Sequence, residues 1–221
     1  MQTGNKFFYR NTANIVSILG LLPLSILFLD NGYKYIIPLI IYNNIMDDTD
    51  GILAIKMNIK SNFGAMLDNF CDGISHCILV MAVGMHFGGI SIAASLIAVT
   101  GIMLRVVSRL LPSAVTGTGS PTNELIRHMF FVLLLALLFD LNATPLLIAV
   151  FTIHAVSMLV PYKMPYLIRS ITKSATAIGL INVALLIAWL VPFTTPVIAA
   201  GFILTYLFAF TVGGVKWLKS I

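Results

Sequence analysis

The chain has 221 residues, of which 59% are hydrophobic and 10% are charged, and its mean hydropathy is +0.99. Soluble domains carry about 25% charged residues, so this composition excludes an ordinary soluble domain. The formal net charge of +5 does not indicate nucleic-acid binding, because the sequence contains no compact basic or aromatic patch.

The hydrophobic residues occur in runs close to the length that a helix needs to cross a hydrocarbon core about 30 Å thick. We expect eight membrane-spanning helices, and the two shortest runs leave a count of six or seven open. The runs cover residues 13–29, 35–57, 62–86, 88–111, 122–140, 144–161, 175–192 and 195–217. The predicted fold class is an all-α, polytopic membrane helical bundle, formed by a single domain over residues 1–221.

The N-terminal residues combine a basic flank with an apolar stretch, as a signal peptide does. No small-residue cleavage site precedes Asp30, so the stretch is interpreted as a retained first helix. Residues 2–11 are predicted to form a short amphipathic segment that lies on the membrane surface.

The positions of Lys and Arg predict the orientation in the membrane. With eight spans, all of the 13 Lys and Arg residues except Lys34 fall at or near helix ends on the side of the N-terminus; Lys6, Arg169 and Lys173 are among them. Basic residues accumulate on the cytoplasmic side of a membrane, so both termini are expected there.

Acidic residues are concentrated in one part of this apolar chain. Three of its 8 Asp and Glu residues lie in the stretch DDTDGILA, residues 47–54, and Asp68 and Asp72 follow it closely. A carboxylate at the centre of a membrane helix costs about 3 kcal/mol on insertion scales. The concentration of acids therefore indicates a functional site.

A helical hairpin over residues 35–86 is predicted to bring these acids together. Helical periodicity gives each helix one face that carries the relevant residues: Asp47, Asp50, Gly51 and Ala54 on the first, and Gly64, Asp68 and Asp72 on the second. With a turn near residue 60, Asp50 comes level with Asp68. Asp47 then comes level with Asp72, so four carboxylates share one cleft. Asp48 points off this face, as a neighbour of the site or toward solvent.

Carboxylates that converge in this way repel one another unless cations neutralise them. Oxygen ligands without His or Cys suit hard divalent ions such as Mg²⁺, Mn²⁺ or Ca²⁺. Two such ions held by shared carboxylates can clamp a phosphoryl or pyrophosphoryl group. Gly51 and Ala54 leave a flat surface beside the acids, where a planar base or a phosphate can approach the helix closely.

At these residues the sequence resembles the CDP-alcohol phosphotransferase (CDP-alcohol phosphatidyltransferase) family, class I. The family pattern is Asp-x2-Asp-Gly-x2-Ala-Arg-x8-Gly-x3-Asp-x3-Asp, and it is met by Asp47, Asp50, Gly51, Ala54, Gly64, Asp68 and Asp72. One position departs from it, because Ile55 stands where the family has Arg. Lys56 and Lys60 are the candidates to replace that Arg.

The resemblance implies a metal-dependent transferase of phospholipid synthesis. Such an enzyme moves a phosphatidyl group from a CDP-linked lipid, such as CDP-diacylglycerol, to a small alcohol and releases CMP. Two Mg²⁺ or Mn²⁺ ions would be held by Asp47, Asp50, Asp68 and Asp72, and Asp72 would also be the catalytic base. The candidate contacts of the nucleotide-linked donor are Gly51, Ala54, Gly64 and Lys56. The expected partners are the donor, the acceptor and membrane lipids, and a homodimer is left open.

The acceptor alcohol is predicted from a looser match. A Ser soon after the last Asp, two Arg on the next helix and a Gly-x-Pro loop resemble the phosphatidylserine synthase branch; the matching residues are Ser75, Arg105, Arg109, Gly119 and Pro121. The two Arg would present a shared positive face to an anionic acceptor, which favours serine, or serve only as topology anchors. His76, one turn beyond Asp72, is a further candidate for this pocket. Choline, inositol phosphate and glycerol phosphate are the alternatives.

The competing function is a cation- or proton-coupled transporter, in which intramembrane carboxylates bind the coupling ion. The sequence shows neither an inverted repeat nor a pair of broken helices, and the acids lie near one membrane face, so the enzyme is favoured, with its active site at the cytoplasmic face. Elsewhere, His128 and His154 are expected to hydrogen-bond between helices, and Glu124 to stabilise the first turn of its helix through the helix dipole.

Overall fold

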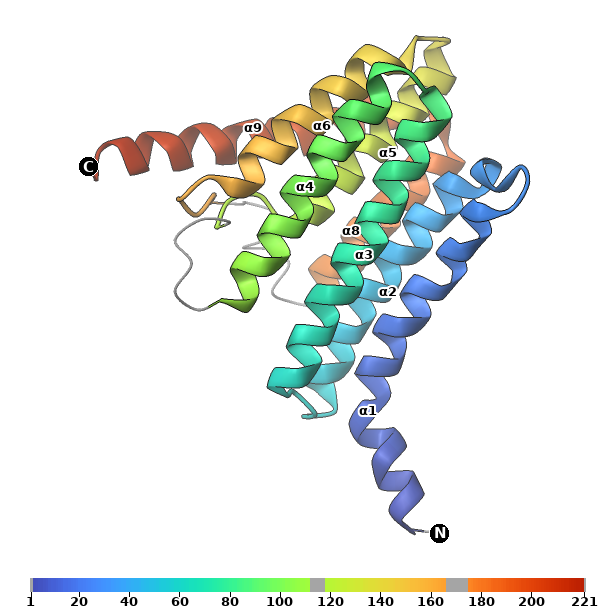
Figure 1. The fold of residues 1–221 in the computed structure, drawn as a ribbon, viewed down its shortest axis with the longest axis vertical. Coiled ribbons are helices and arrows are strands. Elements are labelled where there is room, and N and C mark those ends of the chain that lie inside the picture. Colours follow the sequence, from blue (N-terminus) through green and yellow to red (C-terminus); the bar gives the residue numbers. More distant parts are fainter. Residues whose placement is uncertain (1, 112–117, 166–174, 221) are drawn as a thin grey trace.

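The computed structural model describes residues 2–111, 118–165 and 175–220. Arg169 and Lys173, which contribute to the predicted orientation, lie outside the described residues, and so does the side chain of Lys6. Every regular element in the described part of the chain is a helix (Figure 1).

The described α-helices are α1 (Gln2–Leu21), α2 (Ile36–Lys56), α3 (Asn62–Phe87), α4 (Ile90–Leu110), α5 (Thr122–Phe139), α6 (Ala143–Leu159), α8 (Ala175–Leu190) and α9 (Thr195–Leu218). Three short 3₁₀ segments are η1 (Leu22–Phe28), η2 (Gly32–Tyr35) and η3 (Pro192–Thr194). Five described segments are long and apolar enough to cross a membrane: Phe7–Phe28, α3, α4, α5 and Pro192–Leu218. The predicted all-α membrane bundle is therefore confirmed.

The first helix starts earlier than the sequence predicts. Residues 2–11, expected as a separate surface segment, are continuous with the first span in α1, whose N-terminal turns project beyond the α2–α3 turn (Figure 1). The chain has no proline before Pro23, so nothing breaks the helix earlier. At Pro23 α1 gives way to η1, because proline has no N–H to donate to the carbonyl four residues earlier. That carbonyl, of Leu19, accepts a hydrogen bond of 3.0 Å from the Tyr42 hydroxyl of α2.

Among the described helices, α5 is the most completely buried, and it contacts α2, α3, α6 and α9. Nearly every side chain in its first three turns is buried. The Phe131 ring packs against Phe202 of α9 with a centroid distance of 5.1 Å. The His128 Nδ1 lies 3.0 Å from the His154 Nε2 of α6, so the predicted hydrogen bond between these helices is confirmed.

The turn between α2 and α3 sets how the two acidic faces meet. Asn58 takes a left-handed conformation with φ 54°, which asparagine tolerates better than most residues. The Ser61 hydroxyl accepts a hydrogen bond of 2.9 Å from the Gly64 N–H and so caps α3. Helix α1 packs against both α2 and α3, and its Tyr9 hydroxyl donates to the Met57 carbonyl at 3.2 Å. The Ser61 cap and the contact from α1 thereby hold the turn in place.

Close approach of helices in the middle of the bundle depends on small residues. Helix α4 packs against both α3 and α6. A Cβ atom added at Gly101 of α4 would lie 3.0 Å from the Ala155 Cα of α6. Small residues let membrane helices approach to this extent, and the close packing then holds them together.

We predict that Gly101→Leu lowers the stability of the purified protein by about 1–3 kcal/mol, the usual cost of overpacking. Thermal unfolding in detergent, followed by tryptophan fluorescence, measures the effect. The matched control is Gly201→Leu on α9, where an added Cβ meets no atom within 4 Å; it should change stability by less than about 0.5 kcal/mol. Equal effects of the two variants would show that the α4–α6 contact is not critical.

Candidate active site

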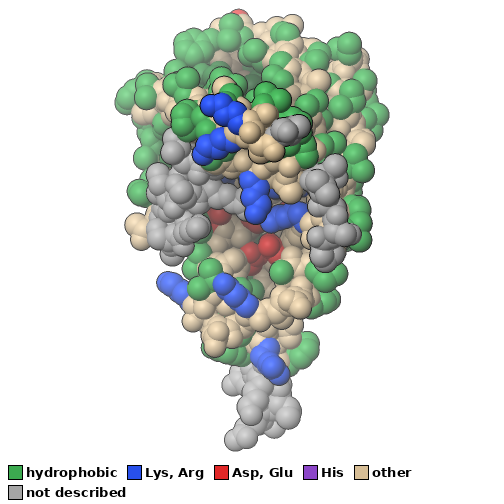
Figure 2. All heavy atoms as spheres, turned by 90° about the vertical axis from the view of Figure 1, so that its left-hand side faces the viewer, with side chains coloured by type: hydrophobic (Ala, Val, Ile, Leu, Met, Phe, Trp, Pro, Cys, Tyr) green, Lys and Arg blue, Asp and Glu red, His purple; other side chains and the backbone are tan. Residues whose placement is uncertain are grey.

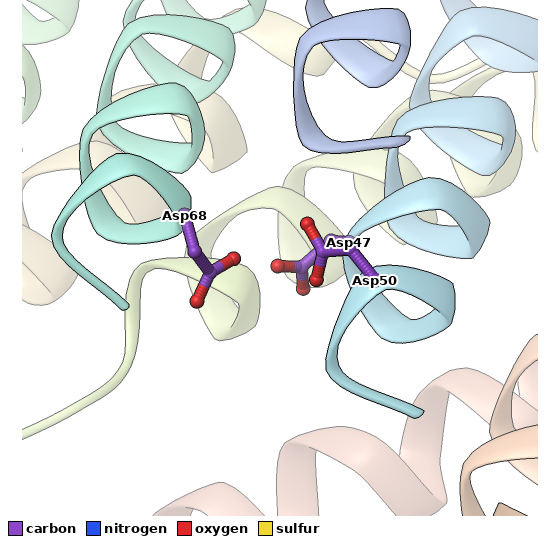
Figure 3. A group of neighbouring side chains, drawn as sticks. All are labelled: Asp47, Asp50 and Asp68. Carbon is purple, nitrogen blue, oxygen red and sulfur yellow. The ribbon is translucent and has the colours of Figure 1, made fainter. Parts of the chain in front are cut away.

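Three carboxylates from two helices meet in this structure. Asp47 and Asp50 lie on α2, and Asp68 of α3 faces them (Figure 3). One oxygen from each of the three carboxylates lies within 4.8 Å of one oxygen from each of the other two. The three side chains form a triad that offers only oxygen atoms, the ligands that hard divalent cations take.

Asp72, the fourth predicted acid, lies beside this triad rather than within it. Asp72 lies one helical turn further along α3 than Asp68. Its carboxyl interacts directly with that of Asp47 on α2. It is therefore placed next to the triad but is not one of the three residues whose oxygens all lie within 4.8 Å of one another. Asp72 as a metal ligand and as a base stays a prediction.

Two polar side chains from other helices hold the triad in place. The Asn123 amide of α5 donates a hydrogen bond of 2.6 Å to the Asp47 carboxylate. The Ser17 hydroxyl of α1 donates to the Asp50 carboxylate, which is only 4% exposed. These donors orient the carboxylates but add no positive charge, because both groups are neutral.

The triad has the properties of a cation site. The Asp68 Oδ1 atom is buried and has no hydrogen-bond partner among the described residues. The salt bridge found among those residues joins Arg127 to Glu124 and involves none of the triad. A buried carboxylate oxygen without a donor is costly unless a charge neutralises it. A divalent cation therefore fits the residues that are present.

A cavity of about 470 Å³ opens beside the triad. Its walls come from three helices and the turn between α2 and α3, and they include Asn14, Ser17, Asp50, Gly51, Ala54, Gly64 and Asp68. We call it the acid cavity. Its volume is in the range of small-molecule sites.

The two glycines of the motif serve the acid cavity in different ways. A Cβ added at Gly51 would meet no atom within 4 Å, so this glycine leaves open space for a ligand against α2. A Cβ added at Gly64 would lie 3.0 Å from the Asn14 Oδ1 and 3.1 Å from the Ser61 Oγ. Gly64 therefore lets α1 approach α3 and close the wall.

Helix α1 is the part of the site that sequence reasoning missed. Asn14 and Ser17 belong to no motif, yet both line the acid cavity. The signal available in the sequence was small: two polar residues three positions apart, and hence on one face, within an otherwise apolar run.

The lining of the acid cavity distinguishes between the two lysines that were candidates to replace the family's Arg. Ile55, which stands at the Arg position, lines the acid cavity, and so does Lys60. Lys56, the predicted donor contact, is exposed on the last turn of α2 and is not part of this lining. Of the two lysines, the structure places Lys60 at the cavity.

The four predicted acceptor residues do not form one group. Ser75 and His76 are buried, and the His76 Nδ1 lies 2.8 Å from the Thr122 hydroxyl of α5. The Arg105 guanidinium donates to the Met158 carbonyl of α6 at 3.4 Å. The Arg109 guanidinium instead donates to the Asn69 amide oxygen of α3 at 3.1 Å and interacts electrostatically with Asp68.

The two arginines thus contact different helices, where the sequence suggested a shared positive face. Their spacing of four residues places their Cα atoms on one side of α4, but long side chains can turn to either neighbour. Thr116 and Gly117, in the loop that follows, lie outside the described residues.

Asp48 belongs to a polar network on the other side of α2. Its carboxylate accepts hydrogen bonds from the Asn182 amide of α8 at 2.7 Å and from the Asn44 amide at 3.2 Å. The Asn44 oxygen in turn accepts from the Arg127 guanidinium at 3.1 Å. Asp48 is therefore a neighbour of the site that is tied to α8, and not a solvent-facing residue.

Glu124 lies in the first turn of α5, as predicted, and it also has a partner that the sequence did not suggest. Its carboxylate lies 3.3 Å from the Arg127 guanidinium, three residues later in α5, and both side chains are buried. The predicted interaction with the helix dipole is compatible with this position, but the direct contact is an ion pair. Arg127 was expected only as a basic residue at a helix end.

The comparisons with known proteins agree with the motif. The model of the family CDP-alcohol phosphatidyltransferase matches residues 10–213. The chain belongs to this family. Members of the CDP-alcohol phosphatidyltransferase family are transferases of substituted phosphate groups. The match does not specify an acceptor alcohol.

A curated relative has also been found. A protein of Aquifex aeolicus (strain VF5), described as an uncharacterized protein, is 27% identical over 121 residues. The matched region covers 53% of this chain and 58% of the relative. The chain thus spans little more than half the length of that relative.

We predict that the purified protein binds Mn²⁺ and that Asp68→Asn weakens this binding at least about tenfold, the scale on which metal sites respond to altered ligands. Electron paramagnetic resonance of free Mn²⁺ measures the binding without any substrate. Asp140→Asn is the matched control, because Asp140 is an exposed residue in a left-handed conformation that asparagine also adopts. Unchanged binding in Asp68→Asn would rule out the triad as the metal site.

Proposed function

We propose that this protein synthesises phospholipid, with the whole chain, residues 1–221, acting as one membrane domain. It transfers a phosphatidyl group from a CDP-linked lipid, such as CDP-diacylglycerol, to a small alcohol and releases CMP. One observation carries the proposal: the carboxylates of Asp47, Asp50 and Asp68, at the spacing of the family motif, form a triad, and two of them, Asp50 and Asp68, line a cavity of about 470 Å³. Phosphoryl transfer needs positioning and charge neutralisation above all.

The proposed roles follow from where the side chains lie. Asp47, Asp50 and Asp68 would hold two divalent ions, Mg²⁺ or Mn²⁺, and Asp72 would lie beside these ions. The ions would supply the positive charge that neutralises a pyrophosphate. Ser17 and Asn123 orient two of these carboxylates through their hydrogen bonds. The nucleotide end of the donor occupies the acid cavity, against the open surface at Gly51 and Ala54.

Asp72 is the proposed base. Its carboxylate takes the proton from the acceptor hydroxyl, and the acceptor oxygen forms a bond to the β-phosphorus of the donor. The bond between that phosphorus and the oxygen that bridges it to CMP breaks, and its electron pair leaves with CMP. The products are a phosphodiester lipid and CMP.

An acceptor that bears an anionic group, with serine the first example, is favoured by Arg109. This guanidinium is exposed on α4 and lies near Asp68, so it can reach a molecule bound next to the triad. Arg forms bidentate pairs with carboxylate and phosphate groups. Arg105 is buried and directed to the Met158 carbonyl, so Arg109 is the better candidate of the two.

The central experiment measures CMP release from CDP-diacylglycerol with a panel of alcohols. Asp47→Asn, Asp50→Asn, Asp68→Asn and Asp72→Asn should each lower the rate at least about 100-fold, the scale of losing one charge-stabilising group. Asp48→Asn is the matched control and should retain much of the activity, because an amide oxygen still accepts the hydrogen bond from Asn182. Chelation should stop the reaction, and Mg²⁺ or Mn²⁺ should restore it.

Two results of this experiment would contradict the proposal. Full activity in chelator would remove the metal-dependent mechanism, and a metal-dependent ion flux without CMP release would favour a transporter. If Asp48→Asn is as inactive as Asp68→Asn, the active site is not confined to the side of α2 that carries the triad, and the proposed site is wrong.

For the acceptor, we predict that Arg109→Ala raises the KM for serine about tenfold or more, the effect of losing one charge-assisted hydrogen bond, while the KM for the CDP-linked donor stays unchanged. A rise in KM without a change in kcat indicates that the lost contact was made in the ground state. Lys216→Ala, an exposed basic residue on α9, is the control. If choline is the best acceptor, the proposed role of Arg109 is wrong.

The acid cavity is proposed to open toward the cytoplasm. Figure 2 shows Lys and Arg side chains around a hollow with acidic side chains on its floor. Basic residues mark the cytoplasmic side of membrane proteins.

This orientation predicts opposite labelling of two introduced cysteines, in a variant that lacks Cys71 and Cys77. In intact cells a membrane-impermeant maleimide should label Lys34→Cys but not Lys216→Cys, and Lys216→Cys should react only after permeabilisation. Labelling of both residues in intact cells would overturn the orientation.

A further inference from the structure

A second cavity adjoins the acid cavity at the end of the helical hairpin. It has a volume of about 590 Å³ and lies between the first turns of α1 and the turn that joins α2 to α3. We call it the basic cavity, because Arg10 and Lys60 line it and no Asp or Glu does. Asn14 and Lys60 line both cavities.

Within the part of the chain that the structure describes, no acidic side chain neutralises the charge of the basic cavity. Arg10 and Lys60 are both exposed, and neither has an acidic partner within the described ranges, where the salt bridge found joins Arg127 to Glu124. The side-chain amides of Asn11, Asn14 and Asn58 complete the polar lining. One N–H of the Asn11 amide and one of the Asn14 amide already donate within α1. Two cations beside side-chain amides form a site for an anion, and the guanidinium fork matches the oxygens of a phosphate.

The apolar part of the lining decides which anion fits. Phe7 of α1 is 64% exposed and Phe63 of α3 is 66% exposed, and both line the basic cavity. Exposed aromatic rings beside basic residues at helix ends are typical of the membrane–water interface. A free phosphate ion has no apolar surface to pack against these rings, whereas the glycerol and upper acyl carbons of a phospholipid do.

We propose that the basic cavity binds the headgroup phosphate of an anionic phospholipid, as a site separate from the one that binds the CDP-linked donor. Arg10 contacts the phosphate, Lys60 stands at the border between the two cavities, and Phe7 and Phe63 pack against the glycerol and upper acyl carbons of the lipid. The volume lies in the range of about 300–1,000 Å³ that ligand sites occupy. This site goes beyond the proposed transfer reaction and does not depend on it. Because Asn14 and Lys60 line both cavities, a lipid bound here also contacts the wall of the acid cavity.

The test is a titration of the full-length protein in detergent with phosphatidylglycerol, with bound lipid counted by native mass spectrometry. Phosphatidylcholine of the same acyl chains is the matched lipid, and phosphatidylglycerol should bind at least about fivefold more tightly, the effect of one net charge at a membrane surface. Arg10→Ala should weaken phosphatidylglycerol binding about fivefold on the same grounds. Arg10→Lys, which keeps the charge, should retain most of the binding.

Two further variants separate this site from its surroundings. Lys216→Ala removes one exposed positive charge from α9 and should leave the binding unchanged. Asp68→Asn, which alters the triad, should also bind phosphatidylglycerol as the unaltered protein does. The lipid site is therefore measurable even if the proposed transfer reaction proves wrong.

Several outcomes would overturn the proposal. Equal binding of the two lipids, or equal losses in Arg10→Ala and Lys216→Ala, would show that the basic cavity is not the site. Displacement of phosphatidylglycerol by millimolar inorganic phosphate would show a site for free phosphate. Displacement by CDP would show that the basic cavity is an extension of the donor site.

Discussion

Mutual repulsion between carboxylates is the constraint on which the rest of this structure depends. The triad oxygens lie within 4.8 Å of one another inside a membrane bundle. At about 4 Å and an effective dielectric constant of about 20, each pair of negative charges repels by roughly 4 kcal/mol. The neighbouring donors, Ser17 and Asn123, are neutral, so they orient these charges without offsetting them. Arg109, which interacts electrostatically with Asp68, supplies one positive charge. Three charged carboxylates at this spacing need further cations, which links metal binding to the positions of α2 and α3.

Three other helices hold α2, and hence its carboxylates, in position despite this repulsion. Helix α1 donates through Ser17 on one side, and α5 donates through Asn123 on another. On the side away from the acid cavity, Asn182 of α8 binds Asp48, so α2 is held by polar contacts from three helices. Rigid support of this kind is what a metal-dependent transfer site requires, because small displacements of a ligand are costly to catalysis.

The acidic face of the site could be predicted from the sequence, because helical periodicity and a short turn leave little freedom in where the side chains of a helical hairpin lie. The spacing placed Asp47, Asp50 and Asp68 in one hairpin, and the structure brings these three side chains together. The third wall from α1 was not predictable from any motif, since it depends on how a distant helix packs. The arginines of α4 were also beyond the sequence: their spacing fixes where their Cα atoms lie, but not that Arg105 turns to α6 and Arg109 to α3.

The most direct test of this account is the position of a bound ion. Crystals of the protein grown with Mn²⁺ and measured at the manganese absorption edge would show each ion as an anomalous difference peak. The account predicts a peak between α2 and α3, in contact with Asp47, Asp50 and Asp68, and its loss in Asp68→Asn. A peak beside Asp48 and Asn182, or Mn²⁺ held only at surface carboxylates such as Asp140, would contradict the central claim.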